Sequence, residues 1–275
     1  MSKNTKQFIE QQAFQVREEY GFTSYEIDLH KLGDEVGIEI QTQEVDQRGI
    51  SGALIRSGNN FLIYYSSFIN NIPYQRFSIA HEFGHYFLPE HPENIFDSSG
   101  WHISCANTNS KNSYEKEADY FSTCLLMPKH LFENEIYKFN DGLEAIKELA
   151  RIFNTSLTTT AIRYIELTET PAMLVISSKG IIEAVFDTKE LRKFGAKRYG
   201  KNNIFPGKNI ISREALKKEI FLHEWVDTNQ NIKAIEETIA LGAYDKILTI
   251  VTTTTLYDEI DEHEDVQWEP PRFKK

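Results

Sequence analysis

Two histidines and a glutamate in the segment 81–85 have the residue types and the spacing of a metal site. Residues four apart on a helix project from the same face, so His81 and His85 can bind a single Zn²⁺ through their imidazoles. Glu82 follows the first histidine and would lie beside the metal. There its carboxylate can take a proton from a metal-activated water and pass it to the leaving amine of a peptide. The segment therefore predicts metal-dependent peptide hydrolysis, with Glu82 as the catalytic acid/base.

A pair of structural histidines on a buried helix is the alternative interpretation. Pro73 suits the first turn of this helix, and Pro89 lies beyond its end. Apolar residues occur on several sides between the two prolines, which predicts a buried helix. Two histidines in such a helix would each need a separate hydrogen-bond partner, whereas one shared metal ion satisfies both. We therefore favour the metal site.

A catalytic zinc normally takes a third protein ligand and leaves one position for water. The longer motif His-Glu-x-x-His-x-x-Gly-x-x-His does not continue beyond His85, so we expect the third ligand on another helix. Residues 113–121 predict such a helix, with Glu115 and Asp119 on one face and Ala118 small enough for close helix packing. We expect Glu115 to bind the metal and Asp119 to accept the free N–H of a ligating histidine.

Glu117 is the competing third ligand. It is rotated by about 200° from Glu115 around the helix, so we expect it to face solvent. The alternative role of Glu115 is that of an acidic residue favoured near a helix N-terminus by the helix dipole. We favour Glu115 as the metal ligand.

These motifs resemble the ImmA/IrrE family of metallopeptidases. The resemblance rests on Arg-Phe-Ser-Ile-Ala-His-Glu-Phe-Gly-His at 76–85, Glu-Lys-Glu-Ala-Asp-Tyr-Phe at 115–121 and Leu-Leu-Met-Pro at 125–128. It extends over about residues 20–170 and is specific within the two helices. Ser122 stands where many members have alanine, which is a minor departure.

The resemblance implies that His81, His85 and Glu115 bind one zinc ion and that Glu82 is the catalytic acid/base. Members of this family cleave cytoplasmic regulators, commonly helix-turn-helix repressors of mobile elements or of stress responses. The resemblance thus suggests limited cleavage of one regulator, a DNA-binding repressor. Sites with two histidines and a glutamate also accept Mn²⁺ or Fe²⁺, so these metals remain open beside zinc.

Composition points to an intracellular protein. The 275 residues include only two cysteines, Cys105 and Cys124, and the N-terminus lacks the apolar run of a secretory signal. No apolar stretch is long enough to cross a bilayer, so we expect no membrane association. The net charge of −11 argues against direct nucleic-acid binding and is compatible with a basic protein partner. We expect a cytoplasmic location.

The pattern of the whole chain predicts an α+β fold. We expect a zincin-like, mostly helical peptidase domain with a small β-sheet at 1–170, followed by a mixed α/β C-terminal module at 171–275. Helices are expected at 6–20, 26–36, 73–88, 113–127, 129–138, 141–153, 156–168, 212–224 and 230–241. Strands are expected at 38–41, 52–55, 60–65, 172–177, 181–186 and 247–251. The module carries no catalytic or cofactor motif, and a sensory or substrate-docking role is a hypothesis from its position.

Three local expectations accompany this fold. The first helix should bury Phe8, Ala13 and Phe14 on one face. Residues 89–112 predict a long connection without regular structure, typical of a lid or a disordered segment. The acidic stretch 257–265 predicts a frayed tail.

No motif identifies the group that would stabilise the oxyanion in peptide hydrolysis. The candidates are Tyr64, Tyr65, His91 and His102. Each is more simply explained as structural or solvent-facing. Cys105 can be placed within reach of the metal, although a free cysteine on a loop is the simpler interpretation, and Cys124 is expected in the core.

A function of another class is a metal-stabilised protein that sequesters a regulator without cleaving it. The intact Glu82 argues against this alternative, because a binding module does not need a catalytic acid/base.

Overall fold

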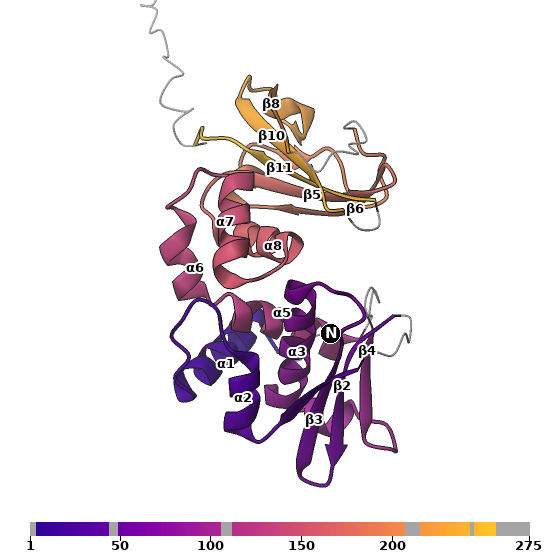
Figure 1. Ribbon diagram of the computed structural model, residues 1–275. Helices are drawn as coiled ribbons and strands as arrows, with labels where there is room; N and C mark the ends of the chain where they lie inside the picture. The colour runs from indigo at the N-terminus through magenta and orange to yellow at the C-terminus, as the bar shows by residue number, and fades with distance from the viewer. Residues whose placement is uncertain (1–3, 44–48, 106–111, 207–214, 243–244, 257–275) are drawn as a thin grey trace, which may run out of the picture. The chain divides into compact units, whose positions relative to one another are not determined.

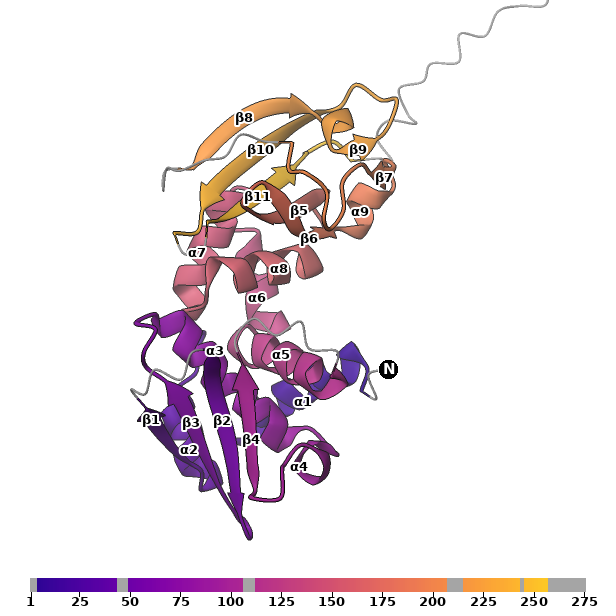
Figure 2. The same ribbon diagram turned by 90° about the vertical axis from the view of Figure 1, so that its right-hand side faces the viewer.

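The computed structural model describes residues 4–43, 49–105, 112–206, 215–242 and 245–256 (Figures 1 and 2). The chain forms two compact units. The first unit comprises Met1–Phe139 and Ala145–Arg163, and the second comprises Asn140–Glu144 and Tyr164–Lys275. The domain boundary predicted at residue 170 stays a prediction. The mixture of helices with separate small sheets confirms the α+β class.

The first unit combines most of the helices with a small sheet. Its helices are α1 (Lys6–Glu19), α2 (Leu29–Val36), α3 (Ile72–Phe87), α4 (His91–Asn94), α5 (Ser113–Leu126), α6 (Lys129–Ile136) and most of α7 (Leu143–Phe153) and α8 (Leu157–Leu167). Its strands are β1 (Glu39–Gln43), β2 (Ile50–Ser57), β3 (Asn60–Ser66) and β4 (Trp101–Cys105). They form one sheet in the order β1-β3-β2-β4, in which only the β1–β3 pair is parallel. Figure 2 shows this sheet beside α3 and α5.

Helix α3 begins and ends where the two prolines predicted. The side chain of Asn71 caps its N-terminus by accepting a hydrogen bond of 3.1 Å from the backbone N–H of Tyr74, and Pro73 occupies the first turn. Residues 78–85 are buried on all sides of the helix, which confirms the expected burial. The segment with the metal-site pattern is therefore a rigid, enclosed element.

Helices α3 and α5 pack closely at one pair of small residues. A Cβ atom built on Gly84 would lie 2.9 Å from the Cα of Ala118, a separation that real Cβ atoms do not reach. Gly84 therefore allows the backbones to approach, and Ala118 has the small size that the close packing predicted. This contact fixes how far the side chains of α5 lie from those of α3.

The second unit is built on a five-stranded antiparallel sheet with the order β6-β5-β11-β10-β8. Its elements are β5 (Ala172–Ser178), β6 (Ile181–Asp187), α9 (Lys189–Arg192), β7 (Ala196–Lys197), β8 (Leu216–Phe221), a 3₁₀ turn (Leu222–Glu224), β9 (Val226–Asp227), β10 (Lys233–Ala240) and β11 (Lys246–Thr252). Buried Val175, Ile182 and Trp225 belong to its hydrophobic core.

Both helices predicted for this unit are wrong where the structure describes them. Residues 216–221 form strand β8 and residues 233–240 form strand β10, whereas 212–214 lie outside the described residues. The Lys and Glu residues of these segments favour helices by propensity, but here they pair across two strands. Lys217 reaches Glu237 at 3.4 Å, and Lys218 reaches Glu236 at 3.2 Å. Tertiary pairing thus overrides local propensity.

Two smaller expectations for the first unit are also wrong. Phe8 and Phe14 are 37% and 36% exposed, whereas Ala13 is buried as expected, together with Ile9 and Val16. Residues 89–105 are not an unstructured connection, because they contain α4 and β4, and residues 106–111 lie outside the described residues. The acidic stretch 257–265 lies outside the described residues. In the part of the chain that the structure describes, no helix is long and apolar enough to cross a membrane.

Candidate metal centre

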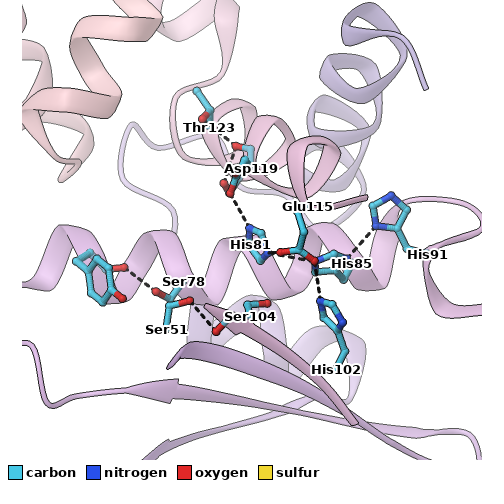
Figure 3. Close-up of polar contacts among 12 residues, drawn as sticks. Ser51, Ser78, His81, His85, His91, His102, Ser104, Glu115, Asp119 and Thr123 are labelled. Atoms are coloured by element: carbon cyan, nitrogen blue, oxygen red, sulfur yellow. Dashed lines mark hydrogen bonds and ion pairs between the residues drawn. The ribbon is translucent and has the colours of Figure 1, made fainter. Parts of the chain in front are cut away.

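Helix α3 presents two imidazoles to one point. His81 and His85 lie one turn apart, and their Nε2 atoms are separated by 3.1 Å. The two residues are 7% and 0% exposed. Figure 3 shows both rings directed from α3 toward Glu115 of the neighbouring helix α5. The predicted pair of histidines is thus brought together, inside the protein.

Glu115 completes a set of three side chains that could hold a metal ion. Its Oε2 lies 3.4 Å from Nε2 of His81, and its Oε1 lies 3.5 Å from Nε2 of His85. In a tetrahedral zinc site with bonds of about 2.0–2.2 Å, ligand atoms lie about 3.3–3.6 Å apart. The two histidine nitrogens are slightly closer than this, and the two oxygens of Glu115 each lie at such a distance from one of them. One ligand atom from each of the three side chains lies within 4.8 Å of the others, so the expected set could share one metal ion.

The chemistry of this donor set also fits a cation. Two imidazole nitrogens at 3.1 Å leave room for at most one proton between them, and a carboxylate supplies the compensating negative charge. Burial alone would raise the pKa of Glu115, but the surrounding histidines outweigh burial and hold it well below its usual range. Two neutral nitrogens and an ionised carboxylate are what Zn²⁺ binds in catalytic sites.

Glu82 lies fully buried beside this site. A Cβ built on Gly52 of β2 would lie 2.8 Å from its Oε1, so the absence of a side chain at Gly52 makes room for the carboxylate. Among the described residues neither carboxylate oxygen has a hydrogen-bond partner. Burial raises the pKa of Glu82, and the proximity of His81 counteracts this in part. A buried carboxyl with a raised pKa and free oxygens is suited to accept and release a proton.

Asp119 contacts the outer nitrogen of His81. Its Oδ1 lies 2.9 Å from Nδ1 of His81, on the same face of α5 as Glu115. When Nδ1 of His81 donates this hydrogen bond, Nε2 is left free to bind a metal. Burial disfavours a charge on His81, but the contacts with Asp119 and Glu115 outweigh it and raise the pKa of the imidazole. Asp119 therefore lies where it can accept the free N–H of His81, as the sequence predicted.

Comparison with known proteins adds a family to this geometry. Residues 34–164 match the peptidase M78 family model, which is described as the IrrE N-terminal-like domain. This region is an ImmA/IrrE-type domain. It includes both helices of the metal centre and the whole of the four-stranded sheet. The family assignment agrees with the resemblance found in the sequence motifs.

Among solved structures, a Mycobacterium tuberculosis transcriptional regulator has a similar fold. The TM-score is 0.56 at 13% sequence identity, and the match covers 89% of this chain and 76% of that chain. At this identity the likeness concerns the fold alone. No curated protein matches the sequence significantly.

The ImmA/IrrE-type domain places a third histidine at the site. Nε2 of His102, on β4, lies 3.1 Å from both Oε1 of Glu115 and Nε2 of His85, and the residue is 9% exposed. The alternation along β4 (Trp101 and Ile103 exposed, His102 and Ser104 buried) is a signal that the sequence offered, but the strand was not expected. His102 is thus the oxyanion candidate that the structure brings to the site.

The tyrosine candidates make other ring contacts. Tyr64 stacks on Trp101 at 6.4 Å between ring centres, on the face of the sheet opposite to that of His102. Tyr65 lies edge-on to His30 of α2. Cys105 is exposed at the end of β4, and Cys124 is buried, as expected for a core residue.

Glu117 was expected to face solvent, and this is wrong. It is 1% exposed, and its Oε2 lies 3.4 Å from Nε2 of His91, which is itself fully buried on α4. Nδ1 of His91 lies 3.0 Å from Nδ1 of His85. The face of α5 that helix geometry assigned to solvent is covered from two sides, because Oε2 of Glu117 also accepts a hydrogen bond of 2.5 Å from the side chain of Asn4, just before α1. Neither His91 nor Glu117 carries a local signal of this contact.

Proposed function

We propose that this protein is a zinc-dependent endopeptidase that makes limited cuts in a cytoplasmic regulatory protein, with a helix-turn-helix transcriptional repressor as the substrate. One observation carries the proposal. The side chains of His81, His85 and Glu115 converge with the spacing of a zinc site, and the unpaired carboxylate of Glu82 lies beside them. A purely structural metal site does not require a buried, unpartnered carboxyl group.

Each side chain has a defined part in this function. His81, His85 and Glu115 would hold the metal, and Asp119 would keep His81 in the tautomer that binds through Nε2. A bound zinc ion supplies Lewis acidity, which acidifies water and polarises a peptide carbonyl. Glu82 accepts a proton from water at a carboxylate oxygen and delivers it to the leaving nitrogen of the cleaved peptide. His102 lies where its Nε2 can orient Glu115 or donate to a substrate oxygen.

The substrate class follows from the family and the charge. The ImmA/IrrE resemblance suggests regulators that bind DNA, and DNA-binding proteins present basic surfaces. A net charge of −11 favours association with a basic protein and disfavours direct binding to nucleic acid. Residues 171–275 are proposed to dock the substrate or to sense the activating signal.

The metal content of the purified protein tests the proposal first. The wild type should contain about one zinc per chain, and His81→Ala should contain none. Glu82→Gln should keep the zinc and lose cleavage of the regulator by about a hundredfold or more. A wild-type protein that neither contains nor takes up zinc would overturn the proposal. A zinc-containing wild type that retains an intact bound regulator would instead support the sequestering function.

A further inference from the structure

Three fully enclosed side chains lie in line behind the metal-facing nitrogen of His85. Nδ1 of His85 lies 3.0 Å from Nδ1 of His91, and Nε2 of His91 lies 3.4 Å from Oε2 of Glu117. The three residues are 0%, 0% and 1% exposed. They come from the three separate elements α3, α4 and α5, and Figure 3 shows His85 and His91. We refer to Glu117, His91 and His85 as the buried relay.

The two facing Nδ1 atoms restrict the positions of the protons. At 3.0 Å one nitrogen donates and the other accepts, so only one of them carries a hydrogen. In its neutral form each imidazole holds a single proton on one of its two nitrogens. Two arrangements remain. Either His85 donates from Nδ1 and binds metal through Nε2, or His91 donates and the proton of His85 occupies Nε2.

Glu117 decides between these arrangements. Its carboxylate is an acceptor, so it favours a proton on Nε2 of His91. Nδ1 of His91 is then free of a proton and accepts from Nδ1–H of His85. Nε2 of His85 is left with its lone pair directed at Glu115 and His81. The opposite arrangement would leave a buried carboxylate facing a nitrogen without a proton, which is unfavourable.

We propose that His91 and Glu117 are positioning residues that hold His85 in its metal-binding tautomer through the buried relay. The inference rests on the proposed metal site and assigns a role to two residues outside the ligand set. It differs from the contact of Asp119 with His81, because here a second imidazole stands between the carboxylate and the ligand. His91 also packs edge-on against Tyr114, with ring centres 4.8 Å apart, so its replacement must preserve ring packing.

Two variants separate the relay from simple packing. His91→Phe keeps an aromatic ring against Tyr114 and removes both nitrogens. Glu117→Gln keeps the shape and an acceptor oxygen but removes the charge. We expect His91→Phe to weaken zinc binding by about tenfold to a hundredfold, and Glu117→Gln to weaken it by less. Glu148→Gln, at an exposed pair with Arg151 on α7, is the matched control and should bind zinc as the wild type does.

The measurements are zinc affinity by chelator competition and the tautomer of His85 by ¹⁵N NMR of the full-length protein. The wild type should show a protonated Nδ1 on His85 both with and without zinc, and His91→Phe should lose this preference without zinc. Wild-type affinity and an unchanged Nδ1–H in His91→Phe would overturn the relay. A wild type that binds no zinc would contradict the proposed function, and a proton on Nε2 of His85 in that metal-free protein would separately contradict the relay.

Discussion

The two histidines of the candidate metal centre lie one turn apart on the same helix, yet the protein supports them in different ways. The outer nitrogen of His81 contacts Asp119, whose side chain is 58% exposed. The outer nitrogen of His85 contacts His91, which is fully enclosed and backed by a buried glutamate. Water can take the place of Asp119 when its side chain is lost, but water cannot reach the enclosed position of His91. Equivalent positions on a helix therefore do not imply equivalent contributions to the site.

The two histidines also differ in the direction in which their surroundings shift the pKa of the imidazole. Despite its burial, the neighbouring carboxylates raise the pKa of His81, whereas burial lowers the pKa of His85. Without metal, His81 favours the protonated form and His85 the neutral form. Zinc binding would thus displace a proton from His81 and meet a free lone pair on His85. In the proposed site, the contact of Nδ1 of His85 with His91 would leave Nε2 of His85 free for the metal, whereas His81 would release a proton when the metal binds.

Removal of each ligand should give the largest effects and should distinguish the two supports. His81→Ala and His85→Ala should both abolish zinc binding. His85→Ala should also lower the free energy of unfolding of the metal-free protein by about 1–3 kcal/mol, because Nδ1 of His91 is left buried without a partner. His81→Ala should lower the free energy of unfolding by less, since Asp119 can bind water. Urea unfolding in the presence of a chelator measures this free energy for both variants, and equal decreases would contradict the difference between the two supports.

A change at the helix contact should affect both histidines together. Gly84→Ala places a methyl group against Ala118 and forces α3 and α5 apart. We expect the free energy of unfolding to fall by about 1–3 kcal/mol and zinc binding to weaken, because Glu115 moves away from both rings. Thermal unfolding and chelator competition measure these effects. Unchanged zinc affinity in a destabilised variant would show that the ligand set does not depend on this packing.

Loss of the exposed support should have the smallest effect. Asp119→Ala should weaken zinc binding by less than about tenfold, near the lower end of the effects known for residues behind a metal ligand, because water can accept from Nδ1 of His81. A loss for Asp119→Ala that exceeds the loss for His91→Phe would reverse the order of the two supports.

The same contrast explains what the sequence could predict at the site. The predicted site residues lie on two helices, and their spacing along each helix is enough to predict which of them share a face. They are His81, Glu82, His85, Glu115 and Asp119. His91 and Glu117 meet only because the chain folds back through α4, in a segment where no regular structure was expected. His102 depends on β4 in the same segment. Contacts between elements leave no periodic signal within any one of them.

The fold shows the same limit on a larger scale. Helices with buried faces, such as α3 and α5, were predicted within one or two residues of their ends. Strands β8 and β10 were expected to be helices, because their Lys and Glu residues are good helix formers. Only the register between the strands shows that Lys217 and Lys218 of β8 pair with the two glutamates of β10. Helix propensity depends only on the residues of a segment, whereas an edge strand such as β8 forms by pairing with its neighbour, β10.

Gly52 has a consequence for how the proposed activity could be adjusted. Its backbone is not among those with a positive φ angle, so the position tolerates other residues conformationally. What it lacks is space, because the carboxylate of Glu82 occupies the volume that a methyl group would need. A single added carbon at Gly52 would therefore displace the carboxylate of Glu82, the proposed proton carrier, while the proposed metal ligands and their charges are retained.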